Sequence, residues 1–118
     1  MRGFGHLERD VMRAIWRAGQ PVTGREIAGT ITTHQELAYT TVITVVERLR
    51  DKGYLGRRRD GRSYRYHPLV TEEDYASALM EQVLDDSDDR SGALLRFAGR
   101  LTAEEADALR TALTQRGE

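Results

Sequence analysis

Hydrophobic residues recur at intervals of three and four positions through the first half of the chain, a spacing that predicts amphipathic helices. We expect three such helices, over residues 6–18, 24–32 and 39–52. A Gly-Gln-Pro stretch ends the first, because proline disfavours helical backbone in the residue before it. Thr23 and Glu26 have the spacing of a capping box and begin the second helix, while a Lys-Gly pair ends the third.

The third expected helix separates apolar from polar positions. Its apolar stripe has the spacing i, i+3, i+4 and i+7 and consists of Val42, Val45, Val46 and Leu49. At about 100° per residue, the opposite face carries Thr40, Thr44, Glu47, Arg48 and Asp51, with Thr41 on its flank. The β-branched residues would also suit a strand, but the length and the spacing favour a helix.

After residue 53 the period changes from helical to alternating, which predicts a β-hairpin. Two extended runs, residues 54–58 and 63–67, lie on either side of Asp60-Gly61, a dipeptide typical of two-residue hairpin loops. With that loop, the expected cross-strand pairs are Arg59 with Arg62 and Arg57 with Tyr64. Alternation then puts Leu55, Arg57, Tyr64 and Tyr66 on one face and Arg58, Ser63 and Arg65 on the other. Val22 is expected to add a short strand contact.

Three helices followed by a basic hairpin are the order of elements in a winged helix-turn-helix. The predicted fold class is therefore mainly α with a small β-hairpin, a winged helix-turn-helix over residues 1–70 followed by C-terminal dimerisation helices over residues 71–118. The second part contains three short amphipathic helices, which have too little apolar surface to fold alone and are expected to pair with a second copy. The residues expected to form that dimer contact are Tyr75, Leu79, Val83, Leu94, Leu95, Phe97, Leu101, Leu109 and Leu113.

Charge is distributed unevenly over the 118 residues, although the formal net charge is only -1. The first 70 residues hold 13 Lys and Arg against 7 Asp and Glu, a net of +6, whereas the remainder holds 5 against 12, a net of −7. A basic half joined to an acidic half indicates that the first half meets a polyanion. The absence of cysteine excludes disulfides and thiolate metal sites. No apolar run approaches the ~18 residues of a membrane span and no secretory signal is evident, so we expect a cytoplasmic protein with no direct membrane insertion.

The polar face of the third helix and the arginines of the hairpin are together typical of double-stranded DNA binding. Threonine can contact phosphate or a thymine methyl group, and Arg48 can bridge guanine O6 and N7. The arginines expected to neutralise the DNA backbone are Arg57, Arg58, Arg59, Arg62 and Arg65. Alternatively, the domain is a winged-helix protein-interaction module that does not bind DNA, but the outward face of its third helix would then be apolar.

No enzymatic or cofactor site is indicated by the sequence. His6, His34 and His67 lack the spacing of a zinc site, and the chain has no glycine-rich phosphate loop or nucleophile elbow. The acidic stretch 85–89 lacks the glycine and the distal glutamate of an EF-hand loop. We therefore expect a protein that is not an enzyme, with no cofactor and no metal.

Several stretches resemble the penicillinase repressor (BlaI/MecI) family: LERDVMRAIW, PVTGREI, LAYTTVITVVERLRDKGYL, YRYHPLV and the tail LTAEEADALRTAL. The resemblance implies a homodimeric transcriptional repressor whose winged helix binds a palindromic operator in antibiotic response. It also implies that the recognition helix begins at Ala38 or Tyr39, and its operator-facing positions are Tyr39, Thr40, Thr41, Thr44 and Arg48.

In well-studied members of this family, a membrane sensor-protease that detects β-lactams leads to cleavage of the repressor in its C-terminal region. Where staphylococcal members have an Asn-Phe bond, this chain has Arg96-Phe97, and only Phe97 matches. Copper-responsive relatives carry a Cys-rich tail, which this chain lacks.

Overall fold

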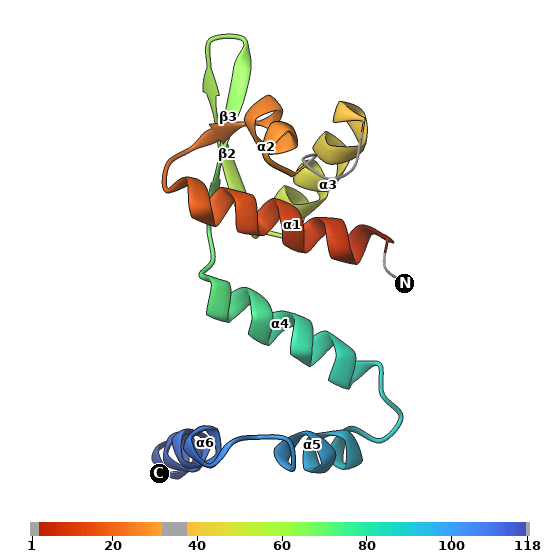
Figure 1. The fold of residues 1–118 in the computed structure, drawn as a ribbon, viewed down its shortest axis with the longest axis vertical. Coiled ribbons are helices and arrows are strands. Elements are labelled where there is room, and N and C mark those ends of the chain that lie inside the picture. The colour runs from red at the N-terminus through yellow and green to blue at the C-terminus, as the bar shows by residue number, and fades with distance from the viewer. Residues whose placement is uncertain (1–2, 32–37, 118) are drawn as a thin grey trace. The chain divides into compact units, whose positions relative to one another are not determined.

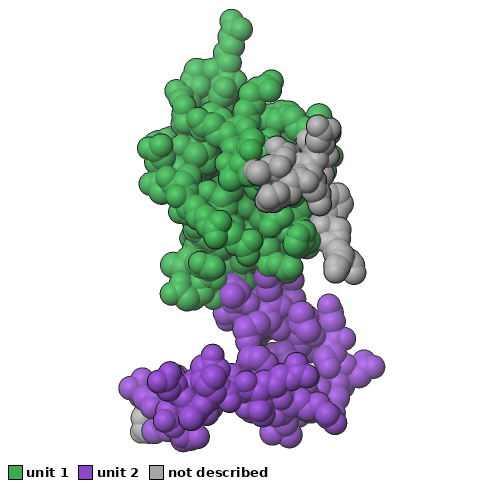
Figure 2. Space-filling model, viewed as in Figure 1, with its two compact units in different colours: residues 1–75 green, residues 76–118 purple. Residues whose placement is uncertain are grey.

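The computed structural model describes residues 3–31 and 38–117 of the chain and confirms the mainly helical fold class. It divides the chain into two units, residues 1–75 and 76–118 (Figure 2). The elements, labelled in Figure 1, are α1 (Gly3–Ala18), β1 (Val22–Thr23), α2 (Gly24–Ile31), α3 (Tyr39–Asp51), β2 (Leu55–Asp60), β3 (Ser63–Pro68), α4 (Glu72–Asp85), α5 (Arg90–Ala98) and α6 (Ala103–Arg116). No helix in the described ranges is long and apolar enough to cross a membrane.

The first unit packs α1, α2 and α3 against one another and against the base of a three-stranded antiparallel sheet (Figure 1). The predicted apolar stripe of α3 is fully buried in this core. The largest buried side chains are Met12, Ile15, Ile27, Leu49, Leu55, Val11, Val42, Val45 and Val46. At about 25 cal/mol per Å² of apolar surface, this burial is the main source of the unit's stability.

The helix ends follow the signals in the sequence. In the capping box of α2, the Glu26 amide donates to Thr23 Oγ1 at 3.1 Å and the Thr23 amide donates to Glu26 Oε1 at 2.9 Å. The predicted end of α3 is confirmed by a Schellman motif, in which the Tyr54 amide donates to the Leu49 carbonyl at 3.0 Å. Gly53 supplies the left-handed backbone that this motif requires, with φ of 90°.

The predicted hairpin is present, but the predicted pairing register of its two strands is wrong. Asp60 pairs with Ser63, so the two loop residues are Gly61 and Arg62 rather than Asp60 and Gly61. Only Gly61 has positive φ, at 66°, which matches a turn with glycine at its first central position. The predicted loop would have required positive φ at Asp60, which is costly for a residue with a Cβ.

The observed cross-strand pairs are Arg57 with Tyr66, Arg58 with Arg65 and Arg59 with Tyr64, in place of the predicted Arg57–Tyr64 and Arg59–Arg62 pairs. This register is displaced by two residues, so each side chain keeps its predicted face. β1 adds to the other edge of β3, as expected for Val22, which pairs with Tyr66. We call the hairpin β2–β3, residues 55–68, the wing.

Some helices have bounds that differ by a few residues from those predicted. α1 begins at Gly3 rather than residue 6, and α3 ends at Asp51, one residue before the predicted end. α2 is described to Ile31, and the predicted last residue, 32, lies outside the described residues. α5 begins at Arg90, where the side chain of Asp89 caps it by accepting from the Gly92 amide at 2.9 Å. α4 runs from Glu72 to Asp85.

Tyr75 lies in the core of the first unit. Its side chain is 4% exposed and packs edge-on against Trp16 and Tyr54, with ring centroids 5.5 and 5.2 Å away. The Trp16 indole in turn donates to the Val70 carbonyl at 3.0 Å. The Tyr75 ring is therefore largely covered within its own chain, and its part in a dimer contact stays a prediction.

Candidate nucleic-acid interface

The outer face of α3 is polar, as the helical spacing predicts. Thr40, Thr44 and Arg48 are exposed and Thr41 is half-buried. The Thr44 hydroxyl donates to the Thr40 carbonyl at 2.8 Å, which leaves its methyl group and its oxygen lone pairs for other contacts. At the beginning of the helix, the Tyr39 ring is 40% exposed. These side chains form the surface that the sequence predicts for a groove of DNA.

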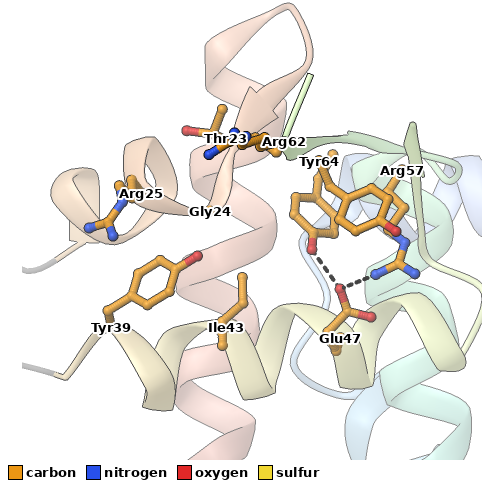
Figure 3. A pocket seen from close by; sticks show the side chains of 11 residues that line it. Thr23, Gly24, Arg25, Tyr39, Ile43, Glu47, Arg57, Arg62 and Tyr64 are labelled. Atoms are coloured by element: carbon orange, nitrogen blue, oxygen red, sulfur yellow. Dashed lines mark hydrogen bonds and ion pairs between the residues drawn. The ribbon is translucent and has the colours of Figure 1, made fainter. Parts of the chain in front are cut away.

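The N-terminus of α2, the outer side of α3 and the wing border an open cleft of ≈ 700 Å³ (Figure 3). Gly24 forms part of its wall, and a Cβ there would lie 2.6 Å from Ile43 Cδ1, so a larger residue would require the Ile43 side chain to shift. Arg25 and Arg62 also line the cleft, and the Arg25 guanidinium lies 5.0 Å from the centroid of the Tyr39 ring. Three separate elements thus bring cations and aromatic rings beside the polar face of α3.

Glu47 does not face outward as the helical spacing predicts. Its carboxylate accepts hydrogen bonds from the Tyr66 hydroxyl at 2.5 Å, Arg57 Nη1 at 2.9 Å and Arg50 Nε at 2.8 Å. Burial alone would raise the pKa of Glu47, but these hydrogen bonds and the charges of Arg57 and Arg50 outweigh it and lower that pKa. Helical spacing gives the direction in which a side chain leaves its helix, but not which other element packs against that face. At Glu47 that element is the wing.

The wing arginines fall into different environments. Arg57 is paired with Glu47, and its guanidinium lies 3.9 Å from the centroid of the Tyr64 ring. Arg65 contacts Asp60 at 2.5 Å and Glu26 at 3.5 Å.

The remaining wing cations are more exposed. Arg59 donates to the Tyr64 hydroxyl at 3.0 Å and keeps an exposed side chain. Within the described ranges, the exposed side chains of Arg58 and Arg62 make no hydrogen bond or ion pair. Arg58, Arg59 and Arg62 are therefore the wing cations whose charge no carboxylate among the described residues opposes, and Arg58 and Arg62 also make no hydrogen bond.

The sequence did not single out Arg25, and it predicted Arg57 as a wing cation without predicting its contact with Glu47. Arg25 has one local signal, because it is a cation in the first turn of a helix, where the helix dipole disfavours positive charge. The contacts of Glu47 with Arg57 and Tyr66 have no local signal, since they join residues ten and nineteen positions apart along the chain; only its contact with Arg50 follows from i,i+3 spacing.

The second unit keeps many apolar side chains exposed. Among the residues predicted for a dimer contact, Leu79 and Leu101 are half-buried, and the exposed ones are Val83 (70%), Leu94 (44%), Leu95 (74%), Phe97 (46%), Leu109 (48%) and Leu113 (52%). Arg96 and Phe97 lie near the end of α5, and both are exposed.

The described residues contain no group of three or more His, Cys, Asp or Glu side chains that could hold a metal ion. His34 lies outside the described residues.

The chain resembles known proteins both in sequence and in structure. The model of a family described as penicillinase repressor matches residues 4–115. Transcriptional regulators named BlaI from two strains of Mycobacterium tuberculosis are each 40% identical over 115 residues, which is 95% of this chain and 83% of each relative.

Two solved structures resemble the first unit. The DNA-binding domain of the repressor BlaI aligns with a TM-score of 0.53 and 28% identity, covering 59% of this chain and 84% of that chain. Monomeric BlaI of Bacillus licheniformis, in complex with the blaP half-operator, aligns with a TM-score of 0.50 and 29% identity, covering 58% of this chain and 83% of that chain.

Proposed function

The chain belongs to the penicillinase repressor family, and we propose that it is a sequence-specific repressor that binds a palindromic operator as a homodimer. As a member, it is a BlaI-type transcriptional regulator with a DNA-binding winged helix, and it is not an enzyme. The observation that carries the proposal is the polar face of α3 beside the unpaired cations Arg58 and Arg62.

In the proposed complex, α3 lies in the major groove of one half-site. Tyr39, Thr40, Thr41, Thr44 and Arg48 contact the bases or the adjoining backbone. The wing grips phosphates beside the groove, chiefly through Arg58, Arg62 and the exposed Arg59. Support for a half-site comes from the relative that is bound to a half-operator. A twofold dimer would place two such helices an integral number of helical turns apart.

A gel-shift on the DNA upstream of the chain's own gene, with random duplex as competitor, tests the proposal. We expect a shifted complex that survives an excess of the random duplex. Arg48→Ala should weaken specific binding by about 1–3 kcal/mol and leave random binding nearly unchanged. If it weakens both equally, Arg48 contacts phosphate and does not select bases. A wild-type chain with no specific shift would instead favour the protein-interaction module.

The salt dependence of binding tests the role of the wing. Replacing Arg58 and Arg62 together by methionine should reduce the slope of log K against log salt by about 0.9 for each phosphate that the wing no longer neutralises. Arg17→Met on α1 is a suitable control, since Arg17 is exposed on a helix that does not border the cleft. An unchanged slope in the double variant would contradict phosphate binding by the wing.

The homodimer is supported by the exposed apolar side chains of α4, α5 and α6. Their removal from water by a second copy would be favourable, at about 25 cal/mol per Å². Leu95→Asp should shift sedimentation equilibrium toward monomer and weaken full-operator binding. Ser91→Asp on the same helix adds the same charge at an exposed polar position and should leave the dimer intact. A fully dimeric Leu95→Asp variant would place the contact elsewhere.

We infer from family membership that the chain acts in antibiotic response, with a membrane sensor-protease as upstream partner. The candidate cleavage bond, Arg96–Phe97, lies within α5, so a protease would need the last turn of that helix to unfold first. Mass spectrometry of the chain after β-lactam exposure of the cells tests this inference. Release of the operator by an intact chain would point to a ligand instead of cleavage.

A further inference from the structure

We propose that Glu47 is a positioning residue that joins the recognition helix α3 to the wing and withdraws Arg57 from phosphate binding. The proposal rests on the DNA-binding function proposed above. It concerns how the two DNA-facing elements are held relative to each other, and it assigns Glu47 no contact with a base.

The geometry of the Glu47 contacts carries the proposal. Tyr66 and Arg57 form a cross-strand pair, one residue on each strand of the wing. Both donate to the same oxygen of Glu47, Oε2, at 2.5 and 2.9 Å, and Figure 3 marks the two interactions as dashed lines. The other oxygen, Oε1, accepts from Arg50 of α3 at 2.8 Å. One carboxylate therefore contacts both strands of the wing, and its own helix fixes its orientation.

The Arg57 guanidinium is held on two sides. Glu47 binds it from α3, and the Tyr64 ring lies 3.9 Å from it within the wing. Its side chain is 29% exposed, comparable to the 32% of Glu47. The lowered pKa of Glu47 keeps the carboxylate ionised at neutral pH, so the opposing charge persists under the conditions of DNA binding. Arg57 would need to lose this anion before it could neutralise a phosphate.

Asp51 provides an internal comparison on the same helix. It lies one turn beyond Glu47, it is exposed, and within the described part of the chain its carboxylate makes no ion pair. An unpaired carboxylate near DNA repels phosphate, whereas Glu47 is opposed by Arg50 and Arg57. Replacing either acid by its amide changes the net charge equally, but only the Glu47 change disturbs the wing.

The experiment measures fluorescence anisotropy of operator and random duplexes over a range of salt, for wild type, Glu47→Gln and Asp51→Asn. With Glu47→Gln, freed Arg57 should steepen the slope of log K against log salt by about 0.9, equivalent to one phosphate. The ratio of operator to random affinity should fall on the order of tenfold, close to the value of one charge-assisted hydrogen bond. With Asp51→Asn, both affinities should rise together, with the slope and the ratio unchanged.

Identical slopes and ratios for the two amide variants would overturn the proposal. Should Glu47→Gln not fold, as checked by circular dichroism, Arg57→Met and Arg58→Met decide the question. Arg58→Met should lower the salt slope by about 0.9 and Arg57→Met should leave it unchanged. Equal reductions would mean that Arg57 binds phosphate in spite of Glu47. A wild-type chain that does not prefer the operator over random duplex would refute the proposed DNA-binding function. That result can be told apart from failure of the Glu47 proposal, because it is seen in the wild type and not in the variants.

Discussion

Removing the hydroxyl groups of Tyr66 and Tyr75 should have opposite effects on stability, although the chemical change is the same. The two side chains are equally buried, at 3% and 4% exposure. The Tyr66 hydroxyl donates to the Glu47 carboxylate at 2.5 Å. The Tyr75 hydroxyl has no hydrogen-bond partner among the described residues. The partner of each hydroxyl, and not its burial, should therefore decide the sign.

The expected magnitudes follow from these contacts. Tyr66→Phe removes a hydrogen bond to a charged group and should cost about 1.5–3 kcal/mol of unfolding free energy. Tyr75→Phe removes a buried polar group that forms no bond, so stability should be unchanged or rise by about 1 kcal/mol. The two variants should differ by at least about 1.5 kcal/mol.

Urea unfolding at pH 7 measures both variants against wild type, at one fixed protein concentration because the stability of the proposed dimer would depend on it. Trp16 is the single tryptophan and reports on the first unit, while far-ultraviolet circular dichroism reports on the helices. The m-values should not change, since neither variant alters the surface exposed on unfolding. A Tyr75→Phe loss as large as that of Tyr66→Phe would show that the Tyr75 hydroxyl is hydrogen-bonded in solution, and would refute the reasoning.

Alkaline pH provides an independent check. The pKa of Tyr66 is raised to about 12 by burial and by Glu47, and that of Tyr75 to about 12 by burial and by the charge of Glu8. The unfolded chain ionises near pH 10, so stability is complete below that value and is lost as pH rises from 10 to 12. Each tyrosine should contribute about 3 kcal/mol to this loss. Either phenylalanine variant should therefore lose less stability than wild type across that window.

Two further substitutions have matched comparisons within the chain. Gly24→Ala should cost less than about 1 kcal/mol, because its Cβ would lie 2.6 Å from Ile43 Cδ1, the end of a flexible side chain that can shift, whereas Gly29→Ala, with nothing within 4 Å, should be neutral or stabilising, as thermal unfolding would show. The Lys52 ammonium donates to both carboxylate oxygens of Glu8, at 3.0 and 3.2 Å, and Glu8 is only 6% exposed. Lys52→Met should therefore cost about 3 kcal/mol of unfolding free energy, because it leaves the Glu8 carboxylate without its partner. Replacing Glu8 by Met as well should recover most of that loss, and a double variant no more stable than Lys52→Met would exclude an unpaired charge as the cause.

Features that depend on neighbouring residues could be predicted from the sequence. The capping box at Thr23 and the glycine that ends α3 each depend on a few consecutive positions. The buried stripe of α3 follows from helical spacing, because a continuous apolar face on a helix of this length must be covered. The order of these elements was then sufficient to identify the winged helix.

Register and long-range contacts could not be predicted in the same way. The Asp-Gly pair indicates a hairpin, but a glycine can occupy either central position of a two-residue loop, and only the folded strands select one. For Tyr75, the helical spacing of apolar residues along α4 predicts that one face of the helix is buried, but it does not show which surface covers that face. Trp16, 59 residues earlier in the chain, is part of that surface and has no local connection to it.

The difference between local and long-range contacts also changes how the net charge of the first half of the chain is interpreted. Five wing arginines counted from the sequence would neutralise as many phosphates, for a salt slope near 4.5 at about 0.9 per phosphate. Arg57 and Arg65 are instead opposed by carboxylates of their own unit. Three remain, for a slope near 2.7. The paired arginines hold the wing in place, whereas the unpaired ones are available to the DNA. Formal charge therefore identifies the class of partner, but only the pairing shows how many cations can reach it.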